Sequence, residues 1–239
     1  MRKHCNYLLL LLFVLVSHAS VAQEEPDQFE TKIAEESPPR QKQYYLFSPR
    51  VSVTVPHPIG NQSFKKSFVG IYEVNAGLNV MIYKGLFVGG TFKNGLLKIT
   101  ENKIPDLNAD MAMNNAALKV GSDFYVGSKN SILLSAALSV GQNNTKYSSF
   151  KCKSVNQHPI IKGFKSSYFE PEVNLFFLTE VNFGIGATLT YSIIKRNFDP
   201  YELCLDEWSQ FGKDNSGPIR YISFGFGFYY GFSKKLKNK

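Results

Sequence analysis

The chain has few of the residues that form metal sites and nucleophilic centres. Its 239 residues include four histidines, three cysteines and one tryptophan. No cysteine and histidine cluster has the spacing of a zinc site, and the glycine pairs do not form a nucleotide-binding loop. Beyond a short N-terminal run, no apolar stretch approaches the 18 residues that a transmembrane helix needs. The sequence therefore predicts no cofactor and no membrane-spanning helix.

Residues 1–22 are predicted to be an export signal. Arg2 and Lys3 precede an apolar run from Leu8 to Val16, which is too short to cross a bilayer as a helix. Small residues at Ser20 and Ala22 suit a signal peptidase, so cleavage is expected after Ala22. The alternative is an N-terminal membrane anchor.

Charge is unevenly distributed along the remaining chain. Residues 23–39 have a net charge of −5, whereas residues 40–239 have a net charge of +11. We interpret residues 23–43 as an acidic, disordered periplasmic leader. The basic remainder suits a surface rich in anionic lipid such as lipopolysaccharide, although solvation of loops would also explain many of the lysines. Nothing indicates nucleic acid as a partner.

What the chain does have is a series of segments in which apolar and polar residues alternate, as in β-strands. Residues 181–195 are an example: Phe183, Ile185 and Leu189 are predicted on one face, and Thr188 and Thr190 on the other. The segments are residues 44–56, 68–82, 86–99, 115–126, 131–147, 167–178, 181–195 and 218–233.

The connections between these segments alternate between short and long. The short ones are residues 83–85, 127–130 and 179–180; the long ones are residues 57–67, 100–114, 148–166 and 196–217. This pattern predicts an all-β fold: an eight-stranded antiparallel up-and-down transmembrane β-barrel over residues 44–233, with short periplasmic turns and four long extracellular loops. Residues 234–239 form a basic tail.

A soluble β-domain would show the same alternation with its faces reversed. The predicted inner face consists almost entirely of Gly, Ser, Thr, Asn and charged residues, and it lacks the apolar core that a soluble barrel needs. This favours the membrane interpretation and a cell outer-membrane location after export.

A barrel of eight strands is narrow, and side chains fill its interior. Inward-facing charges should pair, because an unpaired buried charge is costly. The predicted interior network is Arg50, Glu73, Lys93, Lys119, Asp123, Glu170 and Glu172. This network argues against a wide, water-filled pore, and a small gated conduit lined by the same charges is the alternative.

The closing segment carries a glycine and aromatic spacing at Gly227, Tyr230 and Phe232. On these residues the chain resembles the small eight-stranded outer-membrane barrels of the OmpA transmembrane domain and OmpX type, and the PorT-like barrels common in Bacteroidota. The resemblance covers residues 44–233 and implies recognition by the barrel-assembly machinery. The chain departs from the pattern in continuing past Phe232 and in having Gly225 where a polar residue is common. Functions in this group vary, so the fold fixes none.

Chemistry is sparse in the predicted loops. Outer-membrane palmitoyltransferases use a loop histidine with nearby Asp and Ser; His57 begins the first long loop, but no such pair accompanies it. His158 lies in another loop. We therefore expect no enzymatic activity, with a lipid-modifying enzyme using His57 as the least favoured alternative.

The third and fourth loops could form one cap. Cys152 lies in a lysine-rich loop and Cys204 in an acidic, aromatic loop. In an exported chain these cysteines form one disulfide or stay as two free thiols. We expect a non-enzymatic outer-membrane protein with a structural or interaction role through its loops, its extracellular or periplasmic partner unknown. The alternative is a narrow conduit or a PorT-like accessory of a secretion complex.

Overall fold

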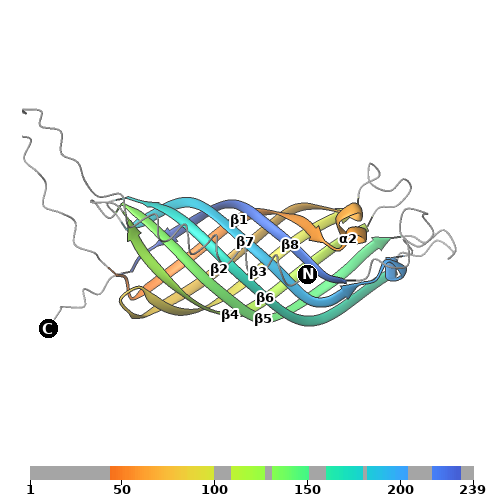
Figure 1. Ribbon diagram of the computed structural model, residues 1–239, viewed down its shortest axis with the longest axis horizontal. Helices are drawn as coiled ribbons and strands as arrows, with labels where there is room; N and C mark the ends of the chain where they lie inside the picture. The colour runs from red at the N-terminus through yellow and green to blue at the C-terminus, as the bar shows by residue number, and fades with distance from the viewer. Residues whose placement is uncertain are drawn as a thin grey trace, which may run out of the picture. The chain divides into compact units, whose positions relative to one another are not determined.

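The computed structural model describes residues 44–99, 109–126, 131–150, 160–179, 182–203 and 217–232, and these form a closed antiparallel β-barrel (Figure 1). Each strand pairs with the next, and β1 pairs with β8 to close the ring. The strands are β1 (Phe47–Gly60), β2 (Phe68–Tyr83), β3 (Leu86–Ile99), β4 (Ala109–Val126), β5 (Ile132–Phe150), β6 (Ile160–Leu178), β7 (Phe183–Phe198) and β8 (Gly217–Tyr230). The predicted fold class is confirmed. The export signal, the leader and the basic tail lie outside the described residues.

One end of the barrel has tight turns. Lys84 and Gly85 connect β2 to β3 and have φ angles of 31° and 98°. Positive φ at both central residues is what a two-residue hairpin turn requires. A Cβ on Gly85 would also lie 2.5 Å from the carbonyl oxygen of Asp123. Glycine is therefore required at this turn.

At the opposite end the strands extend further than the sequence pattern predicts. β1 continues to Gly60, and β4 begins at Ala109. β5 extends to Phe150, and β6 already begins at Ile160. The predicted long loops over residues 57–67, 100–114 and 148–166 are therefore too long. The first contains the α-helix α2 (Gln62–Ser67), and the 3-10 helix η1 (Pro200–Leu203) lies in the fourth. Within the described ranges, no helix has the length and hydropathy to cross a membrane.

The pairing of β1 with β2 ends before the strands do near this end, where α2 lies. Pairing of β1 with β2 stops at Thr54 and Glu73, while β1 continues along β8 to Gly60. Strand edges of this kind tolerate proline, which explains Pro56 and Pro58 within β1.

A β-bulge in β2 changes which side chains face the interior, so one predicted face of this strand is wrong. The register shifts between Gly70 and Tyr72. Regular alternation over residues 68–82 predicts Phe68 on the outer face together with Tyr72, but Phe68 is buried inside while Tyr72 is exposed. Because the bulge inserts one extra residue, odd and even positions exchange faces from one side of the bulge to the other.

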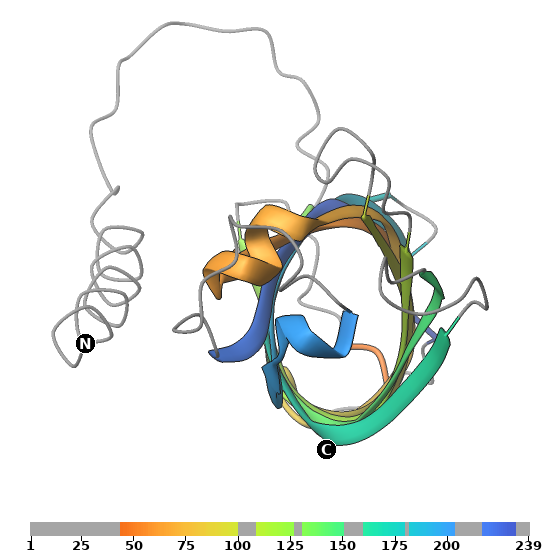
Figure 2. The ribbon, with the colours of Figure 1, turned by 90° about the vertical axis from the view of Figure 1, so that its right-hand side faces the viewer.

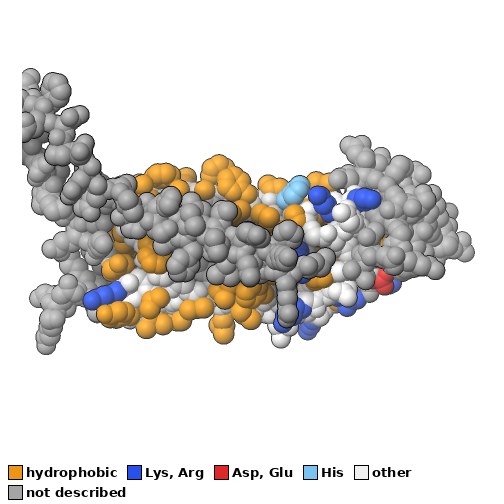
Figure 3. Space-filling model, in the orientation of Figure 1, with side chains coloured by type: hydrophobic (Ala, Val, Ile, Leu, Met, Phe, Trp, Pro, Cys, Tyr) orange, Lys and Arg blue, Asp and Glu red, His pale blue; other side chains and the backbone are white. Residues whose placement is uncertain are grey.

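An apolar band surrounds the barrel nearer its short-turn end. Exposed Phe, Leu, Val and Ile side chains of every strand contribute to it, which confirms the predicted outward positions of Ile185 and Leu189 on β7. Figure 3 shows hydrophobic side chains gathered over this part of the visible surface and Lys and Arg side chains further toward the end that carries α2. We call the part of the barrel beyond the apolar band, on the α2 side, the collar.

Candidate functional site: the sealed interior and the collar

The interior at the level of the apolar band contains three groups of buried ion pairs. In the first, Arg50 Nη2 donates to both oxygens of the Asp123 carboxylate, at 2.8 and 2.6 Å, and Arg50 Nη1 donates to Ser135 Oγ at 2.5 Å. The guanidinium also lies 4.8 Å from the ring centroid of Phe87 and 5.3 Å from that of Tyr229. Carboxylate and aromatic rings together replace the water that this charge has lost.

The second group links β4, β6 and β7. Lys119 Nζ donates to Glu172 Oε2 at 2.7 Å, and Asn174 Nδ2 donates to Glu172 Oε1 at 2.6 Å. Thr188 Oγ1 then donates to Asn174 Oδ1 at 2.7 Å. Both oxygens of Glu172 are thus hydrogen-bonded, which is the condition for burying a carboxylate.

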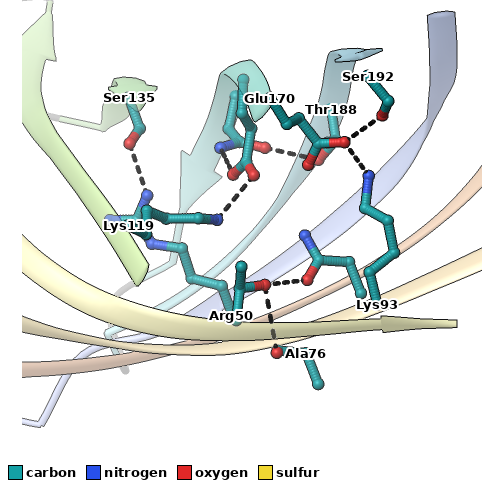
Figure 4. A network of polar contacts seen from close by, with 12 residues as sticks. Arg50, Ala76, Lys93, Lys119, Ser135, Glu170, Thr188 and Ser192 are labelled. Carbon is teal, nitrogen blue, oxygen red and sulfur yellow. Dashed lines mark hydrogen bonds and ion pairs between the residues drawn. The ribbon is translucent and has the colours of Figure 1, made fainter. Parts of the chain in front are cut away.

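In the third group, one lysine serves two carboxylates. Lys93 Nζ donates to Glu73 Oε1 at 2.9 Å. It also donates to Glu170, as Figure 4 shows. Tyr168 and Ser192 donate further hydrogen bonds to Glu170. Since β2, β3 and β6 supply the three charges, the contacts hold opposite walls of the barrel together.

The structure brings all the predicted interior charges together. Each of Arg50, Glu73, Lys93, Lys119, Asp123, Glu170 and Glu172 is at most 7 % exposed. A void of about 10 Å³ lies beside Arg50 and Lys119, which is room for roughly one water molecule. The interior at this level is filled by side chains.

Apolar clusters close the interior above and below these charges. At the short-turn end, Tyr45, Leu133, Phe176 and Tyr229 form a lower cluster. The upper cluster fills the collar and consists of Phe64, Phe68, Leu97, Ile99, Ala109, Met111, Met113, Tyr147, Phe164, Tyr168, Ile194, Phe198, Leu203, Ile219 and Tyr221.

Aromatic contacts connect the members of the upper cluster. Phe64 of α2 lies 5.5 Å from Phe198 of β7, and Phe68 lies 5.9 Å from the same ring (centroid distances). Tyr147 lies 5.8 Å from Phe164. Seen along the barrel from this end, η1 lies within the ring of strands and α2 lies at its rim (Figure 2). The helices therefore help the strands to close the collar.

The sequence pattern missed this upper cluster. The predicted inner face was almost entirely polar, and that prediction is wrong for the collar. A signal was present in residues 92–99, where apolar residues change from even positions (Phe92) to odd positions (Leu97 and Ile99). Such a change reverses which face of a strand is apolar.

The outer face of the collar is polar and basic. Its cations are Lys65, Lys66, Lys98, Lys146, Lys162, Lys165, Lys195, Arg196 and Arg220. The acids that the structure describes there are Asp110, which lies 3.6 Å from Lys98 Nζ, and Asp199. Arg196 places its guanidinium 4.3 Å from the ring centroid of Phe164. Positive charge thus dominates the described surface just beyond the apolar band.

The remaining predicted site residues are dispersed. His57 is exposed on the outer face of β1, opposite Ile222 of β8. Gly227 is buried inside, whereas Tyr230 and Phe232 are exposed and lie 4.7 Å apart, ring to ring. Cys152 and Cys204 lie outside the described residues. Within the described ranges, no group of His, Cys, Asp and Glu could hold a metal ion.

Comparisons with known proteins give a likeness of fold alone. No known protein family and no curated protein matches the sequence. Neisserial surface protein A is similar in structure, with a TM-score of 0.47 and 13 % identity over 78 % of this chain and 97 % of that one. The attachment invasion locus protein Ail of Yersinia pestis has a TM-score of 0.44 and 14 % identity, over 79 % of this chain and 100 % of that one. The outer membrane protein OprG of Pseudomonas aeruginosa has a TM-score of 0.44 and 12 % identity, over 79 % of this chain and 98 % of that one. The closed, eight-stranded up-and-down architecture described above is that of the small outer-membrane barrels.

Proposed function

We infer that the protein is an integral outer-membrane barrel with a sealed interior, which holds its long loops above the membrane for a structural or interaction role. The observation that carries this inference is the reversal of polarity along the barrel. Around the ion pairs the apolar side chains face outward, as lipid requires. In the collar they face inward, as water requires.

The height of the apolar band supports the membrane placement. Outward apolar residues extend from Phe47 to Val55 on β1 and from Ile222 to Tyr230 on β8. These stretches of about nine residues fit the roughly 9–11 that a tilted strand needs to cross the hydrocarbon. The strands themselves are 14–19 residues long, so several residues of most strands project beyond the lipid. We place this projecting end outside the cell.

The filled interior argues against the alternative of a narrow conduit. An ion would have to pass the upper cluster, the buried ion pairs and the lower cluster in turn. Each passage would require packed side chains to move or buried charges to lose their partners. The geometry thus favours a rigid support over a channel.

The position of His57 argues against the enzymatic alternative. A histidine base needs a nucleophile and an orienting partner within hydrogen-bond reach. Among the described residues, the His57 side chain has neither a hydrogen bond nor an ion pair, and the neighbour of His57 across the strands is Ile222. Its place at the upper limit of the apolar band suits a side chain in the polar surroundings of lipid headgroups.

Cell fractionation combined with heat-modifiable gel mobility tests the placement. We expect the band in the outer-membrane fraction, and we expect its mobility to change when the sample is heated in detergent. The purified barrel in a planar bilayer should give no steady conductance. A soluble periplasmic protein without heat modification would overturn the membrane assignment, and stable single-channel steps would overturn the sealed interior.

A further inference from the structure

We propose that the outer face of the collar across β3, β4, β5 and β6 binds the phosphorylated saccharide headgroup of the outer-leaflet glycolipid. This proposal rests on the membrane placement inferred above. It names the molecule that the projecting wall contacts and the side chains that recognise it.

Three asparagines form a row on this face. Asn94 of β3 pairs with Asn114 of β4, and Asn114 pairs with Asn144 of β5. Asn94 Nδ2 donates to Asn114 Oδ1 at 2.8 Å. Directly opposed residues on one face have Cβ atoms about 5 Å apart. The amides therefore form a continuous band of donors and acceptors on the outside of the barrel.

The amide row lies at the level of lipid headgroups. One outward position lower, β3 and β4 present Phe92 and Ala116, and below these Leu118 and Val140 are exposed in the apolar band. Two residues of a tilted strand rise roughly 5 Å along the barrel axis. On β3 and β4 the row thus lies directly above the apolar band, whereas on β5 and β6 the exposed Gln142 and Ser167 lie between the two. A lipid packed on Leu118 has its headgroup beside the amides.

Two lysines flank the β6 end of the row. Lys165 pairs with Asn144, and Lys146 pairs with Gly163. The Cγ of Lys146 lies 3.5 Å from where a Cβ would be on Gly163, so its aliphatic stem leans over β6. Neither lysine forms an ion pair among the described residues. No described carboxylate therefore competes with an anion that binds these two ammonium groups.

This combination fits a phosphorylated sugar better than a glycerophospholipid. Hydroxyl groups of a sugar ring both donate and accept hydrogen bonds, as amides do, and ammonium groups bind phosphate as point charges. In the next row, Leu96, Ala112, Lys146 and Gly163 lie opposite one another on β3 to β6, so the small residues Ala112 and Gly163 lie on either side of Lys146. A sugar ring can approach such a surface closely, whereas a phosphate alone would use only the lysines.

Binding to the full chain, folded in detergent micelles, tests the proposal. The probes are bisphosphorylated lipid A, its dephosphorylated form and phosphatidylglycerol. The Lys146→Ala/Lys165→Ala variant should bind bisphosphorylated lipid A at least about tenfold more weakly, because both ammonium contacts to the phosphate are removed and one charge-assisted contact alone corresponds to about tenfold. The Asn94→Ala/Asn114→Ala/Asn144→Ala variant should bind both lipid A forms more weakly and phosphatidylglycerol unchanged. The matched control, Lys66→Ala/Lys195→Ala, removes two collar cations elsewhere and should change lipid A binding less than twofold.

Two results would overturn the proposal. One is an equal loss of affinity for lipid A and phosphatidylglycerol in the lysine variant, together with unchanged binding in the asparagine variant. That result would indicate unspecific attraction of anionic lipid. The other is a loss in the control as large as that in the lysine variant. Heat-modifiable mobility of every variant separates these results from failure of the membrane assignment: a folded barrel without glycolipid preference overturns this inference alone.

Discussion

The level of the ion pairs and the collar arrange the same kinds of side chain in opposite ways. On β3, Phe92 is 54 % exposed and its neighbour Lys93 is 2 % exposed. A few residues further along the same strand, Leu97 and Ile99 are fully buried and Lys98 faces outward. The strand keeps its alternation while the polarity of its two faces is exchanged. In the membrane placement inferred above, this reversal marks where lipid ends and water begins.

The largest expected difference between the two regions concerns their ion pairs. Lys93→Met should lower the free energy of unfolding by roughly 3–5 kcal/mol, because it leaves buried carboxylates without their cation. Lys98→Met removes the cation of an exposed pair and should cost about 1 kcal/mol or less. Urea unfolding of the folded barrel in lipid vesicles measures both values. Similar losses in the two variants would contradict the difference in burial on which the comparison depends.

Much of the lower region could be predicted from the sequence. Period-two alternation located every strand, and the scarcity of apolar residues between the outward stripes identified a polar interior. The charges at Lys93, Glu73 and Glu170 were predicted inside because they fall on the polar face of their strands. Their specific pairing could not be predicted, since it depends on strand register across the barrel.

The collar could not be predicted in the same way, for two physical reasons. On β2 a bulge at Gly70 and Tyr72 shifts the alternation by one residue, and a regular period carries no sign of it. On β3 the apolar residues change from the outer to the inner face without a bulge. In the sequence pattern, the short stretch after Phe92 therefore looks like the end of a strand. The residues of α2 were interpreted as loop, although Asn61 is a favourable N-cap residue.

A second comparison places the same charge on the outside of each region. Phe226 is 67 % exposed within the apolar band of β8. Phe226→Lys should cost about 2–4 kcal/mol in a bilayer, since the ammonium would face hydrocarbon. Asn197→Lys, on the exposed face of β7 in the collar, should change stability by at most about 0.5 kcal/mol. Unfolding in vesicles distinguishes the two; equal tolerance of both lysines would place Phe226 outside the lipid.

The smallest expected effect concerns the cap of α2. Asn61 Oδ1 accepts a hydrogen bond from Phe64 N at 2.9 Å, and Asn61 Nδ2 donates to the carbonyl of Gly217 at 3.3 Å. Asn61→Ala should therefore lower stability by about 1 kcal/mol. Hydrogen exchange should become faster in α2 and at the adjoining edge of β8.

The location of that change matters more than its size. Phe64 enters the upper cluster from α2, and α2 lies where β1 and β2 no longer pair. The lower strands are held by their own ladder and by buried ion pairs, so their exchange rates should not change. Gln62→Ala, at an exposed position of the same helix, is the matched control and should leave both regions unaltered. Faster exchange throughout the barrel in Asn61→Ala would mean that the collar and the lower region unfold as one unit, because loosening the cap would then destabilise strands that it does not touch.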